Sequence, residues 1–274
     1  MERSVDNLKD IAHRIRQQTF ETICNGGGGH IPASLSIVEI LTALYYGGCL
    51  NVDPKNPSDP ARDRFILSKG HACVSLYAAL AMKGFFDPEE LQRFGKCSSI
   101  LGGHPDMCKV PGIEASTGAL GHGLPFGIGV AMAAKLNRAS YKVFVLLGDG
   151  ECQEGSIWEA AMSAPQFKLD NLVVIVDYNK MQAMDFLDNI IPLEPFVDKW
   201  KAFNWTVTEA DGHDMEKLIE IFNSTPKVTG KPTVIIAHTT KGKGVSFMEN
   251  VPIWHFRMPN ETEMKTAKME LGII

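Results

Sequence analysis

The sequence predicts an α/β fold in which a parallel β-sheet is sandwiched by helices. From about residue 115 onward, short apolar or β-branched runs alternate with stretches of helical periodicity, the pattern of a parallel sheet with crossover helices. The chain has 274 residues, 45% of them hydrophobic, which is enough apolar material for one large core. No low-complexity linker divides it, so we expect a single domain over residues 1–274.

The first third of the chain reads as helices. A helix at the N-terminus has apolar residues at helical spacing and stops before the glycine cluster 26–29. Residues 36–39 read Ser-Ile-Val-Glu, a capping box that predicts a helix reaching about Tyr46. Another helix is expected over residues 72–83, and Asp87 followed by proline starts a short one.

The remaining two thirds should supply the sheet. Strands are expected at residues 143–147, 172–176, 205–208 and 233–237. Helices are expected between and around them, at residues 124–137, 157–167, 196–203 and 215–223. Residues 241–259 read as an irregular loop, after which Asn260 caps a final helix.

Charge and hydropathy exclude several classes of function. The net charge is −5, so there is no basic field for a nucleic acid or an anionic membrane surface. Apolar runs such as residues 143–147 and 172–176 have five residues, against the roughly 20 that a transmembrane helix needs. The N-terminus lacks the apolar segment of a signal peptide, and six cysteines without a CxxC pair read as free thiols. We therefore expect a cytoplasmic protein.

Polar residues follow two of the predicted strands directly. Gly148-Asp149-Gly150 ends one strand, and Asn179 ends the next, about 30 residues later, the length of one strand–helix–strand unit. A right-handed crossover would bring both side chains to the same sheet edge, where ligands of parallel sheets bind. Asp149, Asn179 and the main-chain carbonyl of Met181 would supply three oxygen ligands for Mg²⁺ bridged to a diphosphate. The alternative is a pair of ordinary turns, with Asp149 as a helix cap.

The histidines form a second unusual pattern. Five of the eight follow a glycine, where chance placement predicts fewer than one: His30, His71, His104, His122 and His213. Glycine frees the backbone to turn, so these imidazoles can project from loops into a cleft. Their intrinsic pKa near 6.5 suits proton exchange at neutral pH. A zinc cluster and separate structural roles are the competing explanations, although no pair has the spacing of a preformed zinc site.

These motifs, in order, resemble the thiamine-diphosphate-binding half of transketolase over roughly residues 5–260. The matching segments are Gly29-His30, Lys69-Gly70-His71, Gly102-Gly103-His104-Pro105, STGALGHGL at 116–124, GDGECQE at 148–154 and DYNK at 177–180. The fold implied is the diphosphate-binding fold of thiamine-diphosphate enzymes. The activity implied is transfer of a two-carbon ketol unit from a ketose phosphate to an aldose phosphate.

The resemblance also implies roles for individual residues. Mg²⁺, or Ca²⁺ or Mn²⁺ in its place, would be held by Asp149, Asn179 and Met181. The cofactor would contact His71, Gly118, Leu120, His122, Gly148, Asp149, Gly150, Glu151, Asn179 and His255. The catalytic histidines facing the sugar would be His30, His71, His104 and His255. Glu154 would be the acid that links paired active sites.

The sequence departs from the family pattern in instructive places. His122 stands where many single-chain transketolases have Gln, which matches relatives split over two chains, and Phe256 stands where a Gly is usual. The domain that binds the cofactor's pyrimidine ring and carries the glutamate that activates it would normally follow, but the sequence ends at Ile274. The resemblance therefore implies a subunit completed by a second polypeptide, as a heterotetramer.

Other assignments remain open from the sequence. A piece of a longer enzyme would show the same features. A synthase similar to 1-deoxyxylulose-5-phosphate synthase, or the α subunit of a 2-oxo acid dehydrogenase, would also use thiamine diphosphate, but both release CO₂. A relative that binds the cofactor without turnover is the third alternative, and the number of imidazoles argues against it.

Overall fold

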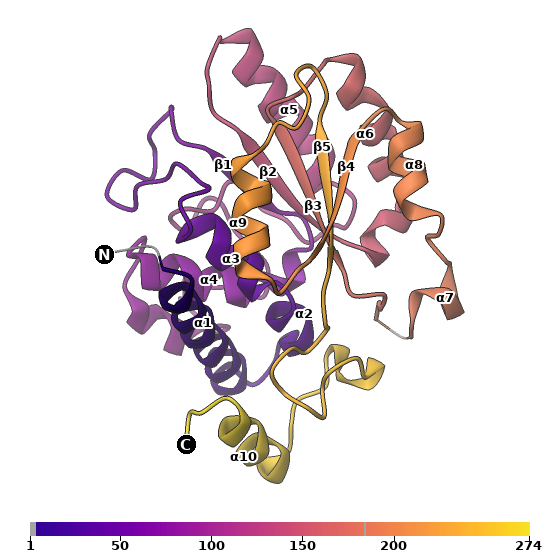
Figure 1. Cartoon of the computed structure of the whole chain (residues 1–274). Coiled ribbons are helices and arrows are strands. Elements are labelled where there is room, and N and C mark those ends of the chain that lie inside the picture. Colours follow the sequence, from indigo (N-terminus) through magenta and orange to yellow (C-terminus); the bar gives the residue numbers. More distant parts are fainter. Residues whose placement is uncertain (1–3, 184) are drawn as a thin grey trace.

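Five parallel strands form the centre of the computed structural model, which describes residues 4–183 and 185–274 (Figure 1). The strands are β1 (Arg64–Leu67), β2 (Val143–Gly148), β3 (Leu172–Tyr178), β4 (Thr206–Asp211) and β5 (Thr233–His238). Their order in the sheet is β1-β2-β3-β5-β4, and every neighbouring pair is parallel. The predicted fold class is therefore confirmed.

The four predicted strands are present, although β4 continues to Asp211, three residues beyond its expected end. The expectation that the first third is helical was wrong for β1, which pairs with β2 at one edge of the sheet. Only three apolar residues follow Arg64 there, too short a run to distinguish a strand from a loop. Pairing with β2 stabilises this short segment as a strand.

Ten α-helices surround the sheet among the described residues. They are α1 (Val5–Gly26), α2 (Ile31–Leu35), α3 (Val38–Tyr45), α4 (Cys73–Lys83), α5 (Gly123–Leu136), α6 (Gly155–Gln166), α7 (Leu187–Ile190), α8 (Phe196–Ala202), α9 (Met215–Asn223) and α10 (Glu261–Glu270). Asp87 and Asn260 cap the helical segments that they were predicted to start. Residues 241–259 form the expected loop, apart from a 3₁₀ turn over Pro252–His255.

The capping box predicted at Ser36 was wrong. Helix α3 begins one residue later than expected, with Ile37 at its cap and no side-chain capping bond. The Ser36 hydroxyl instead donates to the carboxylate of Asp177, 2.8 Å away on β3. Glu39, the other member of the expected box, bonds to Arg16 and His213. Both side chains are recruited by tertiary partners that the local sequence does not reveal.

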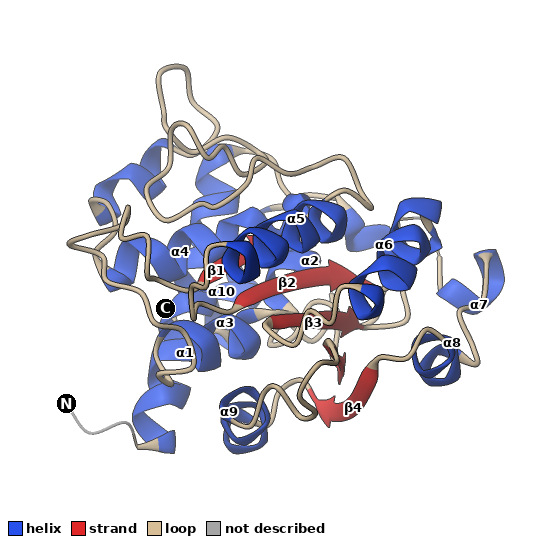
Figure 2. Ribbon diagram, turned by 90° about the horizontal axis from the view of Figure 1, so that it is seen from above, coloured by secondary structure: helices blue, strands red, loops and turns tan. Residues whose placement is uncertain are grey.

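The helices form two layers, one on each face of the sheet (Figure 2). Along β2, Phe144 and Leu146 face the layer containing α1, α3, α4 and α9. Val143 and Val145 face the layer containing α5, α6 and α8. Because successive side chains on a strand point to opposite faces, a strand covered on both faces must be apolar throughout, as β2 is.

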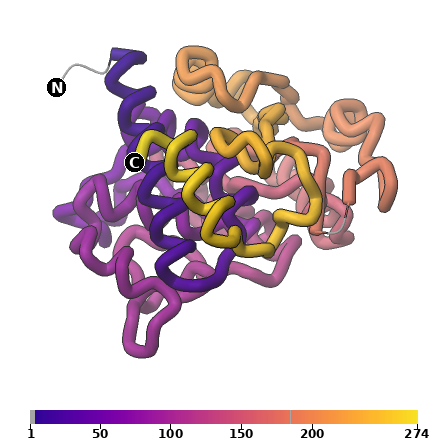
Figure 3. Tube along the Cα trace, turned by 90° about the horizontal axis from the view of Figure 1, so that it is seen from below, coloured from indigo at the N-terminus to yellow at the C-terminus, as the bar shows by residue number. Residues whose placement is uncertain are grey.

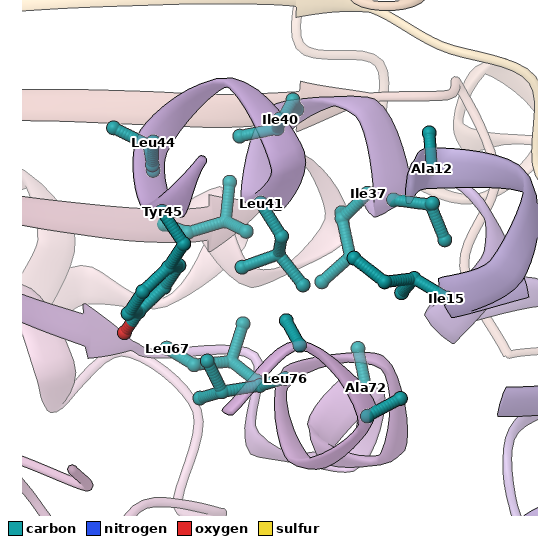
Figure 4. Close-up of a cluster of buried hydrophobic side chains, with 14 of the residues drawn as sticks. Ala12, Ile15, Ile37, Ile40, Leu41, Leu44, Tyr45, Leu67, Ala72 and Leu76 are labelled. Atoms are coloured by element: carbon teal, nitrogen blue, oxygen red, sulfur yellow. The ribbon is translucent and has the colours of Figure 1, made fainter. Parts of the chain in front are cut away.

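Helix α3 is packed between α1 and α4 beneath the sheet (Figure 4). Its Leu41 and the preceding Ile37 point toward Leu76 of α4 and Ile15 of α1, and all four are buried. Burying an aliphatic side chain of this size contributes roughly 1.5–3 kcal/mol. This layer holds α2 and α3, and hence the loop carrying His30, against the carboxyl edge of the sheet.

The C-terminal segment returns to the N-terminal helix. The yellow end of the chain lies across indigo α1 in Figure 3, and Gln17 of α1 donates to the carbonyl of Leu271, 2.9 Å away. All six cysteines are free thiols, as predicted. Within the described ranges, no helix combines the length and apolar character needed to cross a bilayer.

Candidate active site

Strands β2 and β3 end side by side: Gly148, the last residue of β2, pairs with Asp177, the last but one of β3. Asp149 and Asn179 follow these ends, and both side chains are buried, at 2% and 7% exposure. Both also line one cavity of about 620 Å³ at the carboxyl edge of the sheet. The prediction that the two side chains meet at one sheet edge is therefore confirmed.

The Asp149 carboxylate is held by main-chain donors. It accepts hydrogen bonds from the N–H of Gly150 at 2.7 Å and from that of Lys180 at 2.5 Å. Burial, and then the negative charge of Asp177, raise the pKa of Asp149 to about 7. A buried carboxylate beside a second carboxylate gains most from a cation, so Asp149 fits the role of a metal ligand.

Asn179 is oriented by its neighbours. Its Nδ2 donates to Asp177, 3.0 Å away, and its Oδ1 accepts from the N–H of Met181 at 3.1 Å. Because a carboxylate only accepts, Asp177 fixes which end of the amide is which. The carbonyl oxygen of Met181 also faces this region, where the ammonium of Lys241 lies 3.4 Å away.

Asp177 is the buried hub beneath these groups. It is fully buried and accepts hydrogen bonds from Lys69, Ser36, Asn179 and Thr239. The ammonium of Lys69 holds the pKa of Asp177 below its ordinary value despite burial. The hub therefore joins the segments that follow α2, β1, β3 and β5 at the sheet edge. We call Asp149, Asn179 and the Met181 carbonyl the cavity floor.

The donor set of the floor suits a hard divalent cation. A carboxylate, an amide oxygen and a main-chain carbonyl are ligands that Mg²⁺ accepts, with phosphate oxygens and water filling the other positions. Among the described residues, no group of three His, Cys, Asp or Glu side chains could hold a metal by itself. The floor therefore fits Mg²⁺ on a diphosphate better than it fits zinc.

Two predicted glycines lie where a side chain would not fit. A Cβ at Gly150 would come within 2.8 Å of the Cβ of Gln182, across the cavity wall. Gly118 has φ +144°, and a Cβ there would lie 2.8 Å from the ring of His104. Gly148 and Leu120 line the same cavity. Gly150 and Gly118 are therefore required by the close packing of the side chains around the cavity.

The side chain of Glu151, a predicted cofactor contact, hydrogen-bonds to the protein itself. The carboxylate accepts from the N–H of Gly148 at 3.0 Å, from that of Gly121 at 2.8 Å and from the Ser68 hydroxyl. Desolvation raises its pKa. The side chain thus ties the end of β2 to the loop that carries Gly118 and Leu120.

Four of the predicted histidines surround the cavity above the floor. These are His30, His71, His104 and His255, which we call the histidine wall. The ring of His30 lies 5.0 Å from those of His71 and His255, centroid to centroid, and 4.8 Å from Phe256. The wall thus gathers imidazoles from four separate segments of the chain around one space.

The pKa values in the wall differ from the intrinsic value assumed from the sequence. Burial, followed by neighbouring positive charges, lowers the pKa of His30 to about 4 and that of His255 to about 3. Burial and Lys69 lower that of His71 well below its ordinary value. These three rings are therefore neutral at pH 7 in the protein alone. Neutral imidazole can both donate and accept hydrogen bonds, as binding of sugar hydroxyls requires.

Three other predicted positions lie apart or at the rim. His122 is at the N-terminal end of α5 with an exposed ring, whose Nδ1 lies 3.0 Å from the Leu120 carbonyl, and it does not line the cavity. Glu154 is exposed at the cavity rim. Phe256 is 59% exposed and packs on His30 from outside the lining.

Sequence reasoning missed two buried lysines. Lys69 and Lys241 both line the cavity, at 2% and 4% exposure. Burial lowers the pKa of Lys241 to about 8, and its ammonium lies 3.2 Å from Nδ1 of His255. A lysine in a glycine-rich segment directly after a strand, Thr-Thr-Lys-Gly-Lys-Gly at 239–244, was the available signal. Both place positive charge at the cavity.

Comparison with known proteins identifies the family. The model of the family described as "Transketolase, thiamine diphosphate binding domain" matches residues 7–274. The chain belongs to the transketolase family. Its match to this domain covers both the floor and the histidine wall, so the resemblance noted in the sequence is confirmed.

Two transketolase relatives have nearly the same length as this chain. A subunit of apulose-4-phosphate transketolase from Phocaeicola vulgatus is 45% identical over 98% of this chain and 95% of its own length. A subunit of 6-deoxy-6-sulfo-D-fructose transketolase from a Clostridium species is 42% identical, with 98% of each chain covered. Both relatives are thus named as one subunit of their enzyme.

Single-chain transketolases are longer. Human transketolase is 39% identical over 90% of this chain but only 39% of its own length. The crystal structure of transketolase from Campylobacter jejuni superposes with a TM-score of 0.91 at 32% identity, covering 98% of this chain and 43% of that one. The chain thus spans less than half the length of these transketolases.

Proposed function

We propose that this chain is the thiamine-diphosphate-binding subunit of a split transketolase, which transfers a two-carbon ketol unit from a ketose phosphate to an aldose phosphate. The observation that carries the proposal is that the cavity floor and the histidine wall share one cavity in a transketolase-family domain. Thiamine diphosphate, when bound, supplies the carbanion chemistry of the ketol transfer.

The floor would hold the diphosphate through Mg²⁺. Asp149, Asn179 and the Met181 carbonyl are the proposed metal ligands, with Ca²⁺ or Mn²⁺ as substitutes. Gly150 and Glu151 would present main-chain groups to the phosphates. Lys241 would face the diphosphate, because it places a buried positive charge in the same cavity.

The histidine wall would bind and orient the sugar. His30, His104 and His255 would hydrogen-bond its hydroxyl and carbonyl oxygens, and His71 would lie beside the diphosphate. Because these rings line a confined space, they can take up or release a proton as the sugar carbonyl is lost and re-formed. Gly118 and Leu120 would pack against the cofactor rings.

A partner subunit would complete the active site by supplying the pyrimidine-binding domain and its glutamate. The names of the short relatives support a partner, since both are subunits. Two copies of each subunit would form a heterotetramer.

The test mixes the chain with its candidate partner subunit, thiamine diphosphate and Mg²⁺, and follows ketol transfer from a panel of ketose phosphates to aldose phosphates. Pyruvate with the same acceptors forms the second arm. We expect transfer without CO₂. Release of CO₂ from pyruvate would instead identify a decarboxylating synthase, and cofactor binding without either reaction would identify a non-catalytic relative.

The metal requirement is tested separately by calorimetry. Thiamine diphosphate is titrated into the chain with Mg²⁺ and again with excess EDTA. We expect binding only with the metal, because the floor's carboxylate and the diphosphate are both negative. Equal affinity in EDTA would contradict the metal assignment.

A further inference from the structure

A buried polar network behind the cavity joins three elements that do not line it. Glu39 on α3 accepts a hydrogen bond from Arg16 on α1 at 2.6 Å, and its other oxygen lies 2.9 Å from Nδ1 of His213, which precedes α9. All three side chains are largely buried, at 9% to 15% exposure. The sequence singled out His213 through its preceding glycine, but the proposed function gives it no task.

The other ring nitrogen of His213, Nε2, contacts the segment that carries Lys241. The N–H of Thr240 donates to Nε2 of His213 at 2.8 Å. A backbone N–H can only donate, so this Nε2 carries no proton and the ring proton sits on Nδ1, pointing at Glu39. Glu39 therefore fixes the tautomer that allows His213 to hold Thr240.

Arg16 holds the other end of the same segment. Its Nε donates to the carbonyl of Lys243, 3.0 Å away. The next residue, Gly244, has φ +95°, and a Cβ there would come within 2.8 Å of Arg16 Cδ. The close approach of the arginine thus depends on this glycine. His213 and Arg16 thus hydrogen-bond to the two ends of residues 240–243. Both of these side chains also bond to Glu39.

Lys241 lies within residues 240–243. Its ammonium is buried and faces the carbonyls of Met181 and Gln182, at 3.4 and 3.3 Å, and the ring of His255 at 3.2 Å. Contacts of this length to neutral groups do not hold a lysine firmly by themselves. The position of the Lys241 backbone therefore determines the position of the ammonium.

We propose that Arg16, Glu39 and His213 are positioning residues, which act through residues 240–243 to place the Lys241 ammonium in the cavity. The inference rests on the proposed function, in which Lys241 faces the diphosphate. It goes beyond that function because none of the three residues lines the cavity. The network would set cofactor affinity from outside the site.

The main experiment measures the dissociation constant of thiamine diphosphate with Mg²⁺ in the full chain by calorimetry. His213→Phe keeps a ring but removes the acceptor for Thr240, and we expect binding to weaken about tenfold, within the range of coupled networks. His213→Gln offers an oxygen to the same N–H and should recover most of the affinity. Unchanged affinity in His213→Phe would overturn the proposal.

A double-mutant cycle separates positioning from general destabilisation. In a Lys241→Met background, His213→Phe should weaken binding no further, because the charge that it positions is already gone. Two fully additive losses would overturn the proposal. Glu114→Gln is the matched control: Glu114 pairs with Arg62 at similar burial, 12% and 15% exposure, and neither residue lines the cavity. It should lower the melting temperature and leave the dissociation constant unchanged.

Hydrogen exchange provides a readout that needs no cofactor. Amides in a peptide spanning residues 239–245 should exchange faster in His213→Phe than in Glu114→Gln at matched stability. Equal protection would overturn the proposal. If Lys241→Met binds the cofactor as well as the unmodified chain, the proposed role of Lys241 fails, whatever the exchange data show. If Lys241→Met binds weakly and His213→Phe does not, only the positioning inference fails.

Discussion

The floor and the histidine wall face the same cavity but are built differently. Both floor side chains, Asp149 and Asn179, are tied by two hydrogen bonds each to main chain or to the Asp177 hub. The wall rings of His30, His71 and His255 instead pack on one another. A fixed floor suits one unvarying ligand, the metal diphosphate. In the proposed function the wall would instead face the sugar, which differs between the relatives named above.

The largest expected effect is a loss of stability on substitution of Asp177, which supports the floor. Asp177→Asn leaves the Lys69 ammonium buried without its counter-charge, at 2% exposure. Breaking a buried pair in this way costs about 3–5 kcal/mol in the free energy of unfolding. Urea denaturation followed by circular dichroism measures it, and Glu220→Gln, which breaks an exposed pair with Lys217, is the control. Equal midpoints for the two variants would show that the hub does not support the fold.

Removal of the floor's charge should affect binding more than folding. In Asp149→Asn the cation would lose its only charged protein ligand, so we expect the dissociation constant of thiamine diphosphate with Mg²⁺ to rise at least about 100-fold. The melting temperature should hold, because the substitution also removes repulsion from Asp177. Asp198→Asn, at an exposed carboxylate on α8, is the control for calorimetry. Undiminished affinity would remove Asp149 from the metal site.

Substitution of a wall residue should affect the reaction of the sugar more than the binding of the cofactor. His104→Ala, in the complex with the partner subunit, should raise KM for the sugar or lower kcat by about tenfold, the scale of one or two lost hydrogen bonds. The affinity for thiamine diphosphate should stay within about twofold, because His104 is not one of the proposed metal or diphosphate ligands. Steady-state kinetics and calorimetry on the same preparation make the comparison. Loss of cofactor binding would assign His104 to the floor instead.

The floor could be predicted from the sequence because it follows from regular structure. Two strands one crossover apart must end at the same edge, so Asp149 and Asn179 are brought together by topology alone. The strands themselves carry strong signals, since both of their faces are buried. The same reasoning does not predict β1, because its apolar run is too short to be recognised as a strand.

The supports of the floor could not be predicted, because they depend on contacts between distant segments. Asp177 and Lys69 are 108 positions apart in the chain, and Glu39 and His213 are 174 apart. No local pattern distinguishes Ser36 as a donor to Asp177 from Ser36 as a helix cap. The lowered histidine pKa values likewise arise from burial and from lysines that only the folded chain brings near.

The smallest effect concerns the protonation of the wall. Because the pKa of His30 is about 4 in the folded chain, against about 6.5 when unfolded, the unfolded state binds more protons between these values. The contribution of His30 to stability should therefore fall as pH drops from about 6.5 toward 4 and stay level above that window. His30 is partly exposed, so screening reduces its share to about 1 kcal/mol at most.

Urea unfolding of the chain and of His30→Gln at several pH values measures this share. The variant cannot take up a proton at this position, so its stability should depend less steeply on pH below about 6.5, while the two proteins respond alike above it. His13→Gln, at an exposed histidine on α1, is the matched control. If His30→Gln and the unmodified chain keep parallel profiles down to about pH 4, then His30 takes up its proton with little penalty. The wall would then differ from the floor in geometry but would tolerate charge, as the floor does.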